Sequence, residues 1–384
     1  MTRRAGQLIK KGPRKWVART YLGEDARGKR RYHSKTIHGT KKDAEAYLTK
    51  VLRDRDLGTF VEPSSVAFTD YFEEWLEQSA RPRVAPKTLQ DYRALVDRHV
   101  LPALGTFRLS QITAFDVQRL YNGLVDGGLS ARTVRYIHSV IHSALEQAVR
   151  RGLLARNVAK LVDLPRQERR EMQVLTPEQV PAFLTTARED RWGPLWELLL
   201  TTGMRPAEAL GLKWTDVQDG EIVVQRSLVR LSDGSWHLKE PKTPRARRTI
   251  PISEGLARTL RTHRAVQASE QLEAGPTYKS HELVFATSNG SPLDWRVTAR
   301  RHFTPILNRA QLPKIRPYDL RHTCATHLLA LGVNPKVVSE LLGHASIVQT
   351  LDTYTHVLPP MQRDAVSRLE DLYAGVRDIA QSGL

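Results

Sequence analysis

The sequence predicts a multidomain, mainly α-helical protein. We expect a small basic β-sheet with one helix, then a helical bundle, then a mixed, mainly α domain with a small antiparallel sheet. Three observations lead to this prediction. A chain of 384 residues is long for one core, and 40% hydrophobic residues suffice for several. Apolar residues recur at helical spacing over most of the chain. Polar connectors delimit residues 1–61, 66–163 and 172–384, which we expect to be the domains.

The first of these parts is predicted to be two strands followed by a helix. Segments Lys15–Leu22 and Arg30–Ile37 contain aromatic and β-branched residues and flank a polar turn. Thr40 is a favoured helix cap, and its helix should run to about Asp56. A run of cations is usually only a solvated surface. Aromatic side chains alternate with the cations here, so a sheet with one cationic face is favoured.

Residues 66–162 are predicted to form the helical bundle. Phe68, Phe72 and Trp75 recur at helical steps. Further helices are expected from about Thr88, over Thr113–Leu124 and over Ser130–Gly152. Residues 164–170 form a charged connector, which we expect to be the last domain boundary.

The C-terminal part is predicted to begin with a helix capped at Thr176. Its β-structure is expected over Glu221–Arg230, Trp236–Lys239 and Arg248–Ile252. Later helices are expected over Asp319–Leu331, over Pro335–Leu342 and from about Ser346. An apolar stripe of Ala365, Leu369, Leu372 and Val376 predicts one more helix near the end of the chain. That helix has two possible docking sites, its own domain or a neighbouring copy.

Charge points to the class of partner. The chain has 59 Lys+Arg against 41 Asp+Glu, a net charge of +18 and a pI near 10.1. Such a charge repels itself unless a polyanion neutralises it, so nucleic acid is the expected partner. The cations that we expect to contact DNA are Lys11, Arg14, Lys15, Arg19, Arg30, Arg31, Arg132, Arg135 and Arg247.

Composition also excludes other classes. No apolar stretch approaches the ~20 residues that span a bilayer, so no membrane association is expected. The basic N-terminus is not followed by an apolar run, and no secretory signal is expected. The single cysteine, Cys324, excludes an intrachain disulfide, and its helical spacing predicts a small core residue. We expect an intracellular, reducing compartment and neither a metal nor another cofactor.

Five short motifs carry the expected chemistry. Arg205 lies in Thr-Gly-Met-Arg, Lys242 in Pro-Lys-Thr, Arg321 in Tyr-Asp-Leu-Arg-His-Thr, His344 in Leu-Leu-Gly-His, and Tyr354 in Leu-Asp-Thr-Tyr-Thr-His. Each residue alone has an ordinary explanation, such as a surface ion pair, a helix cap or a packing tyrosine. Together, in this order, the motifs resemble the catalytic signature of the tyrosine recombinases, the phage integrase family. One position departs from it, because Tyr318 stands where the family has the first His of His-x-x-Arg.

The resemblance implies a role for each residue. Tyr354 would be the nucleophile, while Arg205, Arg321, His344 and Tyr318 would stabilise the charged phosphate. Lys242 would be the general acid for the departing 5′ oxygen. A tyrosine, with a pKa near ~10, can donate to phosphate but shuttles protons poorly. Helix spacing further predicts that Glu208 holds Arg205 and that His322, next to Arg321, points elsewhere.

The implied function is a site-specific DNA recombinase, the integrase of a phage or other mobile element, acting through a 3′-phosphotyrosyl intermediate. The first two domains would bind arm-type and core-type DNA sites. Four copies would assemble on DNA in the cytoplasm, at the nucleoid, with a host DNA-bending protein and an excision factor as possible partners. Two alternatives stay open at this point: strand relaxation like that of a type IB topoisomerase, and a catalytically idle DNA-binding regulator.

Overall fold

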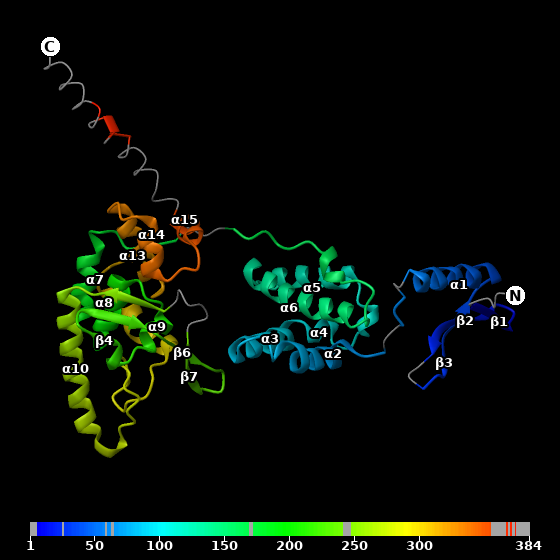
Figure 1. The fold of residues 1–384 in the computed structure, drawn as a ribbon, viewed down its shortest axis with the longest axis horizontal. Helices are drawn as coiled ribbons and strands as arrows, with labels where there is room; N and C mark the ends of the chain where they lie inside the picture. Colours follow the sequence, from blue (N-terminus) through cyan, green and yellow to red (C-terminus); the bar gives the residue numbers. More distant parts are fainter. Residues whose placement is uncertain are drawn as a thin grey trace, which may run out of the picture. The chain divides into compact units, whose positions relative to one another are not determined.

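The computed structural model describes residues 6–24, 27–57, 60–62, 65–168, 172–240 and 247–354, together with residues 366, 367, 369, 370 and 373. The chain divides into two compact units, Met1–Arg169 and Arg170–Leu384. Helices dominate, and the strands form small antiparallel sheets, which confirms the predicted fold class (Figure 1). The three-part domain division remains a prediction.

The N-terminal sheet has one strand more than the sequence predicted. Its strands are β1 (Gly6–Gly12), β2 (Lys15–Glu24) and β3 (Arg30–His38), paired antiparallel in the order β1-β2-β3. We missed β1 because its lysines and bounding glycines give a weak strand pattern, and its partner comes from the following strand. Helix α1 (Lys41–Asp56) begins at Thr40 as predicted, with a capping box formed by Asp43.

Helix α1 covers one face of this sheet. Thr20 and His33 are buried on the covered face, and His33 Nε2 lies 3.0 Å from the Tyr47 hydroxyl on α1. On the uncovered face the guanidinium of Arg19 lies over the ring of Tyr32, 4.0 Å from its centroid. The sheet therefore has one open face that carries cations and aromatic rings, as the sequence predicted.

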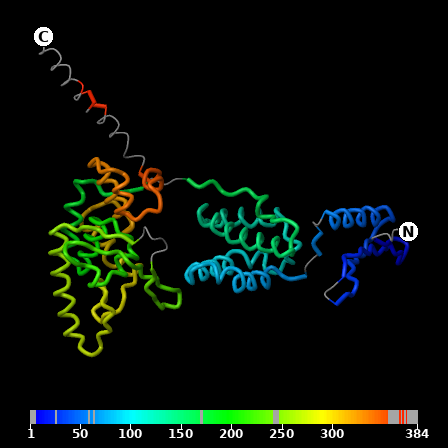
Figure 2. The backbone as a smooth tube through the Cα atoms, viewed as in Figure 1, coloured from blue at the N-terminus to red at the C-terminus, as the bar shows by residue number. Residues whose placement is uncertain are grey.

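The bundle that follows is built from helices α2 to α6. These are α2 (Phe68–Trp75), a π-helical turn (Leu76–Ala80), α3 (Pro86–His99), α4 (Leu101–Leu104), α5 (Ala114–Asp126) and α6 (Ala131–Arg150). Their apolar faces form one core, which the hydroxyl of Tyr71 joins by donating to the Ala144 carbonyl at 2.6 Å. Figure 2 follows the backbone through these helices. Capping side chains at Thr113 and Ser130 begin α5 and α6, close to the predicted starts.

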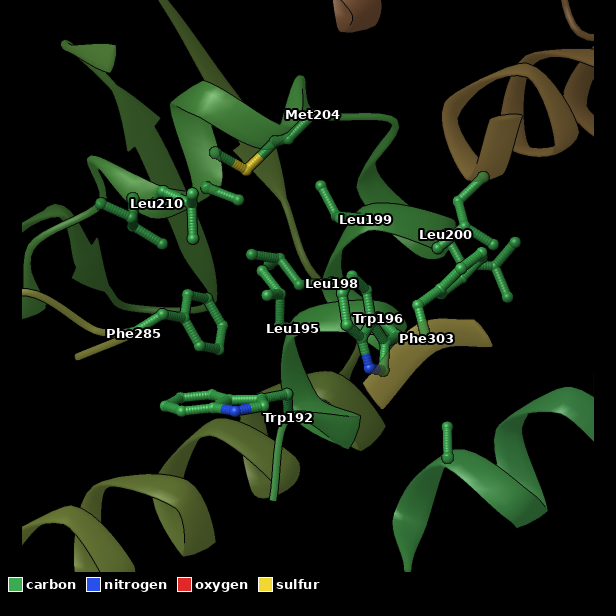
Figure 3. Packing of buried hydrophobic residues seen from close by; sticks show 14 of the residues in the cluster. Trp192, Leu195, Trp196, Leu198, Leu199, Leu200, Met204, Leu210, Phe285 and Phe303 are labelled. Carbon is green, nitrogen blue, oxygen red and sulfur yellow. The ribbon is translucent and has the colours of Figure 1, made fainter. Parts of the chain in front are cut away.

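The second unit has a helical core around α8. Its helices are α7 (Gln179–Arg188), α8 (Gly193–Thr202), α9 (Pro206–Leu210), α10 (Glu254–Ala274), α11 (Trp295–Thr298), α12 (Thr304–Arg309), α13 (Asp319–Ala330), α14 (Pro335–Leu342) and α15 (Ile347–Tyr354). Leu195, Trp196 and Leu199 of α8 are buried together with Phe285 and Phe303 (Figure 3). A helix that is apolar on all sides is buried in the core of its domain, as α8 is. The turn at its C-terminal end is therefore held in a fixed position.

Short strands accompany these helices in the described part of this unit. They are β4 (Val217–Gln218), β5 (Glu221–Val224), β6 (Ser227–Arg230), β7 (Trp236–Lys239) and β8 (Arg248–Pro251). The predicted strand over residues 221–230 is broken, because β5 joins the β4-β5-β8 sheet while β6 pairs with β7 in a separate sheet. The break lies at Gln225 and Arg226, whose side chains both donate to the buried carboxylate of Asp216.

Two other predictions need correction or lie outside the described part. Helix α7 begins at Gln179 rather than Thr176, because the Gln179 side chain accepts from the Thr176 amide and Pro177-Glu178 form a turn. The apolar stripe near the C-terminus falls mostly on residues outside the described ranges. Of its members and neighbours, Val366, Leu369 and Tyr373 are described, and all three are exposed.

Candidate active site

Arg205 follows the sharp turn that ends α8. Gly203 closes α8 in the left-handed region, with φ 63°, and a Cβ there would come within 2.6 Å of the Leu342 side chain. Arg205 then adopts extended backbone and begins α9. Glu208, three residues on, accepts from the Arg205 amide at 3.0 Å and from its Nη1 at 2.7 Å. The Arg205 guanidinium is thus fixed by its own helix.

Arg321 is the most deeply placed of the cations. It is 1% exposed in the first turn of α13, and its guanidinium donates to the Gly203 carbonyl at 2.7 Å and to the Leu342 carbonyl at 2.8 Å. Burial, and then the nearby charge of Arg205, lower the pKa of Arg321 to about 10. Its side chain is therefore still charged at neutral pH and joins the end of α8 to the end of α14.

Arg248, at the start of β8, is a third guanidinium in the same place. Its side chain is 7% exposed; Nε donates to the Leu341 carbonyl at 2.6 Å, and Nη2 donates to Glu208 at 2.9 Å. Arg248 is therefore inside the domain rather than on its surface.

The three arginines hold three successive carbonyl oxygens at the end of α14. Arg248 donates to the carbonyl oxygen of Leu341, and Arg321 donates to that of Leu342. Nη2 of Arg205 donates to the carbonyl oxygen of Gly343 at 3.2 Å. The last carbonyls of a helix have no partner within the helix and carry its negative end, so cations are favoured there. The arginines thereby fix the turn that leads to His344.

Glu208 compensates part of this concentration of positive charge. It is 6% exposed and accepts from both Arg205 and Arg248. Burial alone would raise the pKa of Glu208, but the hydrogen bond and charge of Arg248, and then Arg205, hold it below its ordinary value. The carboxylate therefore stays ionised at neutral pH, and Glu208 supports Arg205 directly.

His344 leaves α14 through Gly343, which closes the helix with φ 66°. The imidazole is 7% exposed, and its Nδ1 lies 2.8 Å from the hydroxyl of the buried Thr350. Burial, and then the charges of Arg321, Arg205 and Arg248, lower the pKa of His344 to about 4. The side chain is accordingly neutral at physiological pH.

Tyr354 is the last described residue of α15. It is 1% exposed, and its hydroxyl lies 2.8 Å from Nδ1 of His322. Burial raises the pKa of Tyr354, and Arg321 opposes that effect. The prediction that His322 points elsewhere is wrong. Arg321 and His322 do have different contacts, as neighbouring helix residues should. His322, however, lies four residues after Tyr318 and is therefore on the same side as Tyr318.

Tyr318 lies beside this pair. Its ring centroid is 5.3 Å from that of His322, and the tyrosine is 39% exposed. The first-His position of the motif is thus occupied by an accessible phenol that contacts an imidazole.

The remaining residues predicted to act in catalysis or to contact DNA lie on the surface or outside the described ranges. Lys242 lies outside them, so its predicted role is not addressed. Arg247 is exposed and pairs with Glu240 at 2.8 Å. The other cations predicted to contact DNA are also exposed: Lys11, Arg14, Lys15, Arg19, Arg30, Arg31, Arg132 and Arg135. Cys324 is buried, as predicted, and burial raises the pKa of its thiol to about 12.

The described residues contain neither a candidate metal site nor a candidate membrane-spanning helix. No group of three or more His, Cys, Asp or Glu side chains there could hold a metal ion. No helix there is both long and apolar enough to cross a membrane.

Comparisons with known proteins identify the family. Residues 173–360 match the model of the phage integrase family, and residues 67–125 match that of the phage integrase N-terminal SAM-like domain. A tyrosine recombinase XerC-like protein of Caldanaerobacter subterraneus subsp. tengcongensis is 32% identical, over 95% of this chain and 98% of that protein. The chain belongs to the phage integrase family. Members of this family are tyrosine recombinases, so the chain is an enzyme of DNA strand breakage and rejoining.

Solved integrases share the fold of this tyrosine recombinase. The Tn1549 transposon integrase in complex with transposon right end DNA matches with a TM-score of 0.68 and 22% identity, over 79% of this chain and all of that one. A lambda integrase tetramer bound to a Holliday junction matches with a TM-score of 0.57 and 19% identity, over 88% of this chain and 95% of that one.

Proposed function

We propose that this tyrosine recombinase is the integrase of a phage or another mobile element and that Tyr354 is its nucleophile. The observation that carries the proposal is the meeting of Arg205, Arg321 and His344 around the end of α14, with Tyr354 on the next helix. A phenol reacts with a phosphodiester only when the negative charge that develops on the phosphate is stabilised. The cations and donors of this cluster can provide that stabilisation.

The proposed reaction has two transesterification steps. Tyr354 attacks a scissile phosphodiester, which forms a 3′-phosphotyrosyl bond and releases a 5′ hydroxyl. The 5′ hydroxyl of a partner strand then attacks that bond and releases the tyrosine. Because bond energy is kept in the phosphotyrosine, no ATP is needed.

Each member of the cluster has a proposed part in holding the phosphate. A guanidinium has five N–H donors, so both arginines keep N–H groups beyond those that hold carbonyls. Arg205 is the more accessible of the two, with 32% of its side chain exposed. His344, neutral and with Nδ1 on Thr350, would present Nε2–H as a further donor. Tyr318 would add its phenol.

Lys242 is proposed as the general acid for the departing 5′ oxygen. A 5′-bridging phosphorothiolate tests this role, because its thiolate leaves without a proton. The modified substrate should restore cleavage by Lys242→Ala but not by Arg321→Ala. Equal rescue of both variants, or of neither, would refute the division of roles.

The proposed partner is double-stranded DNA. Residues 1–61 would contact arm-type sites through the open cationic face of the sheet, and residues 66–163 would contact core-type sites. The catalytic part would be residues 172–384. We propose a homotetramer on DNA at the nucleoid, as the lambda integrase tetramer on a Holliday junction suggests, assisted by a DNA-bending protein and an excision factor.

Deletion of the first 60 residues tests the division of DNA sites. The remainder should cleave core-type DNA and fail to recombine arm-containing DNA. Unchanged integration by the shortened protein would contradict the arm-binding role.

A nicked suicide substrate tests the proposed function as a whole. Its duplex carries the core sequence found where the element joins the chromosome. The nick lets the short fragment that bears the released 5′ hydroxyl diffuse away, so the covalent adduct is trapped. Wild-type protein should form an adduct that survives denaturant. Tyr354→Phe should bind the same DNA in a gel-shift experiment and form none. Absence of a wild-type adduct would favour an idle DNA-binding regulator.

A further inference from the structure

Within the described residues, the hydroxyl of the proposed nucleophile contacts a residue with no part in the reaction described above. His322 Nδ1 lies 2.8 Å from the Tyr354 hydroxyl, and their ring centroids are 5.7 Å apart. The imidazole comes from α13 and the phenol from α15, so the contact joins two helices of the site. A contact of this length between an imidazole nitrogen and a phenol is a hydrogen bond along which a proton can move.

We propose that His322 is a catalytic residue: the proton acceptor that activates Tyr354. This inference rests on the proposed function, because it concerns the same nucleophile. It gives a reason for the departure at position 318, where a tyrosine replaces a histidine. The phenol of Tyr318 cannot accept a proton near neutral pH, since tyrosine is already protonated there. The imidazole one helical turn later can do so.

The arrangement of rings supports this exchange of positions. Tyr318, the residue that precedes α13, and His322 in its first turn have ring centroids 5.3 Å apart and planes at 65°. His322 therefore lies against both phenols. Tyr318 is 39% exposed and Tyr354 is 1% exposed, so the imidazole contacts one accessible phenol and one buried phenol.

The protonation state of His322 is suited to accepting a proton. Burial lowers its pKa from 6.5, Asp319 opposes that effect, and Arg321 and Arg316 lower it further. The titratable or charged groups that act on it or lie against it are Tyr318, Asp319, Arg316, Arg321, His344 and Tyr354. At neutral pH the ring is therefore uncharged. With the proton on Nε2, its Nδ1 lone pair faces the Tyr354 hydroxyl.

The protons of both steps are accounted for by Tyr354, His322 and the proposed general acid. As Tyr354 Oη forms its bond to phosphorus, its proton passes to His322 Nδ1 and the bond to the 5′ oxygen breaks. That oxygen takes a proton from the general acid proposed above. In rejoining, the incoming 5′ hydroxyl returns a proton to that group and bonds to phosphorus. The bond to Tyr354 breaks, and His322 gives the phenolate its proton back.

The test is single-turnover cleavage of the nicked suicide substrate by full-length protein over a range of pH. His322→Asn places an amide near the position of Nδ1, so it can keep the hydrogen bond but cannot take the proton. We expect a rate loss of about 10²-fold or more and disappearance of the acid limb of the wild-type pH–rate profile. His322→Ala should regain part of its activity when free imidazole is added.

His327→Gln is the matched control. His327 lies on the same helix, is partly buried, and contacts the Leu175 carbonyl at 2.9 Å through Nε2, a contact that a glutamine amide can replace. This variant should cleave as fast as wild type, with the same pH profile.

The outcomes separate this proposal from the proposed function. If wild type forms no adduct, the proposed function has failed. If wild type forms the adduct and His322→Asn cleaves at the wild-type rate, or faster, His322 is not the acceptor. A slower variant that keeps the wild-type acid limb and gains nothing from imidazole would equally overturn the role. Thermal unfolding of each variant shows whether a slow one is folded.

Discussion

Arg321 donates a hydrogen bond to the carbonyl oxygen of Leu342 at 2.8 Å, two residues before His344. The same guanidinium donates to Gly203, two residues before Arg205. One buried side chain thus holds the backbone segments that lead to Arg205 and His344, two other members of the proposed site. A residue placed in this way should matter for folding and for catalysis at once.

Replacement of Arg321 by lysine should separate these two contributions. Lysine keeps the charge but lacks the planar fork, so one of the two carbonyls loses its donor. The free energy of unfolding should fall by about 1–3 kcal/mol, measured by urea denaturation. Cleavage should fall by about 10²-fold or more. Arg261→Lys, at an exposed position of α10, should change stability by less than about 0.5 kcal/mol. Equal small effects of both changes would contradict the role given to Arg321.

Glu208→Gln should destabilise the domain, because two neighbouring guanidinium groups lose their shared carboxylate. We expect a loss on the order of 3 kcal/mol at neutral pH. The pKa of Glu208 is held below its ordinary value of 4.5, so its contribution is present above that pH and is lost as the pH falls below it. The difference between wild type and variant should therefore shrink in acid. A difference that does not depend on pH would show that the charge is not what matters.

His344 should titrate near pH 4, well below the ordinary 6.5. Between these values the unfolded chain binds more protons than the folded one. Its contribution to stability is therefore complete above 6.5 and is lost as the pH falls toward 4. Titration of the imidazole signal by NMR, assigned with a His344→Gln variant, measures this value. A midpoint at or above 6.5 would contradict the buried, cation-flanked position.

Thr350→Val should affect His344 without removing it. Valine fills the space of threonine but cannot hydrogen-bond Nδ1, so the tautomer with Nε2–H loses its fixed partner. We expect cleavage to slow about 10-fold with DNA affinity unchanged. Thr353→Val, at a partly exposed position of the same helix, is the control and should cleave normally. Full activity of Thr350→Val would mean that the hydroxyl does not orient His344.

The sequence predicted the elements of this site better than its contacts. Helix ends at Gly332 and Gly343, the turn before Arg205 and the Arg205–Glu208 pair follow from local rules of capping and spacing. Arg248 could not be placed in this way, because its partners Leu341 and Glu208 are distant in sequence and belong to other elements.

His322 was missed for a different reason. Its position next to Arg321 indicates separate faces of the helix, whereas its spacing of four from Tyr318 indicates a shared face, and the contact with Tyr354 follows the second relation. The break between β5 and β6 depends on the buried carboxylate of Asp216, which no periodicity reveals.

The most direct test of the account is the position of the covalent bond. Wild-type protein is trapped on the suicide substrate and digested with nuclease and trypsin, and the nucleotide-bearing peptide is identified by mass spectrometry. The peptide that follows Lys336 and ends at Arg363 contains a single tyrosine, Tyr354. We expect the nucleotide on that peptide. A nucleotide on the peptide that holds Tyr318 or on the one that holds Tyr373 would contradict it.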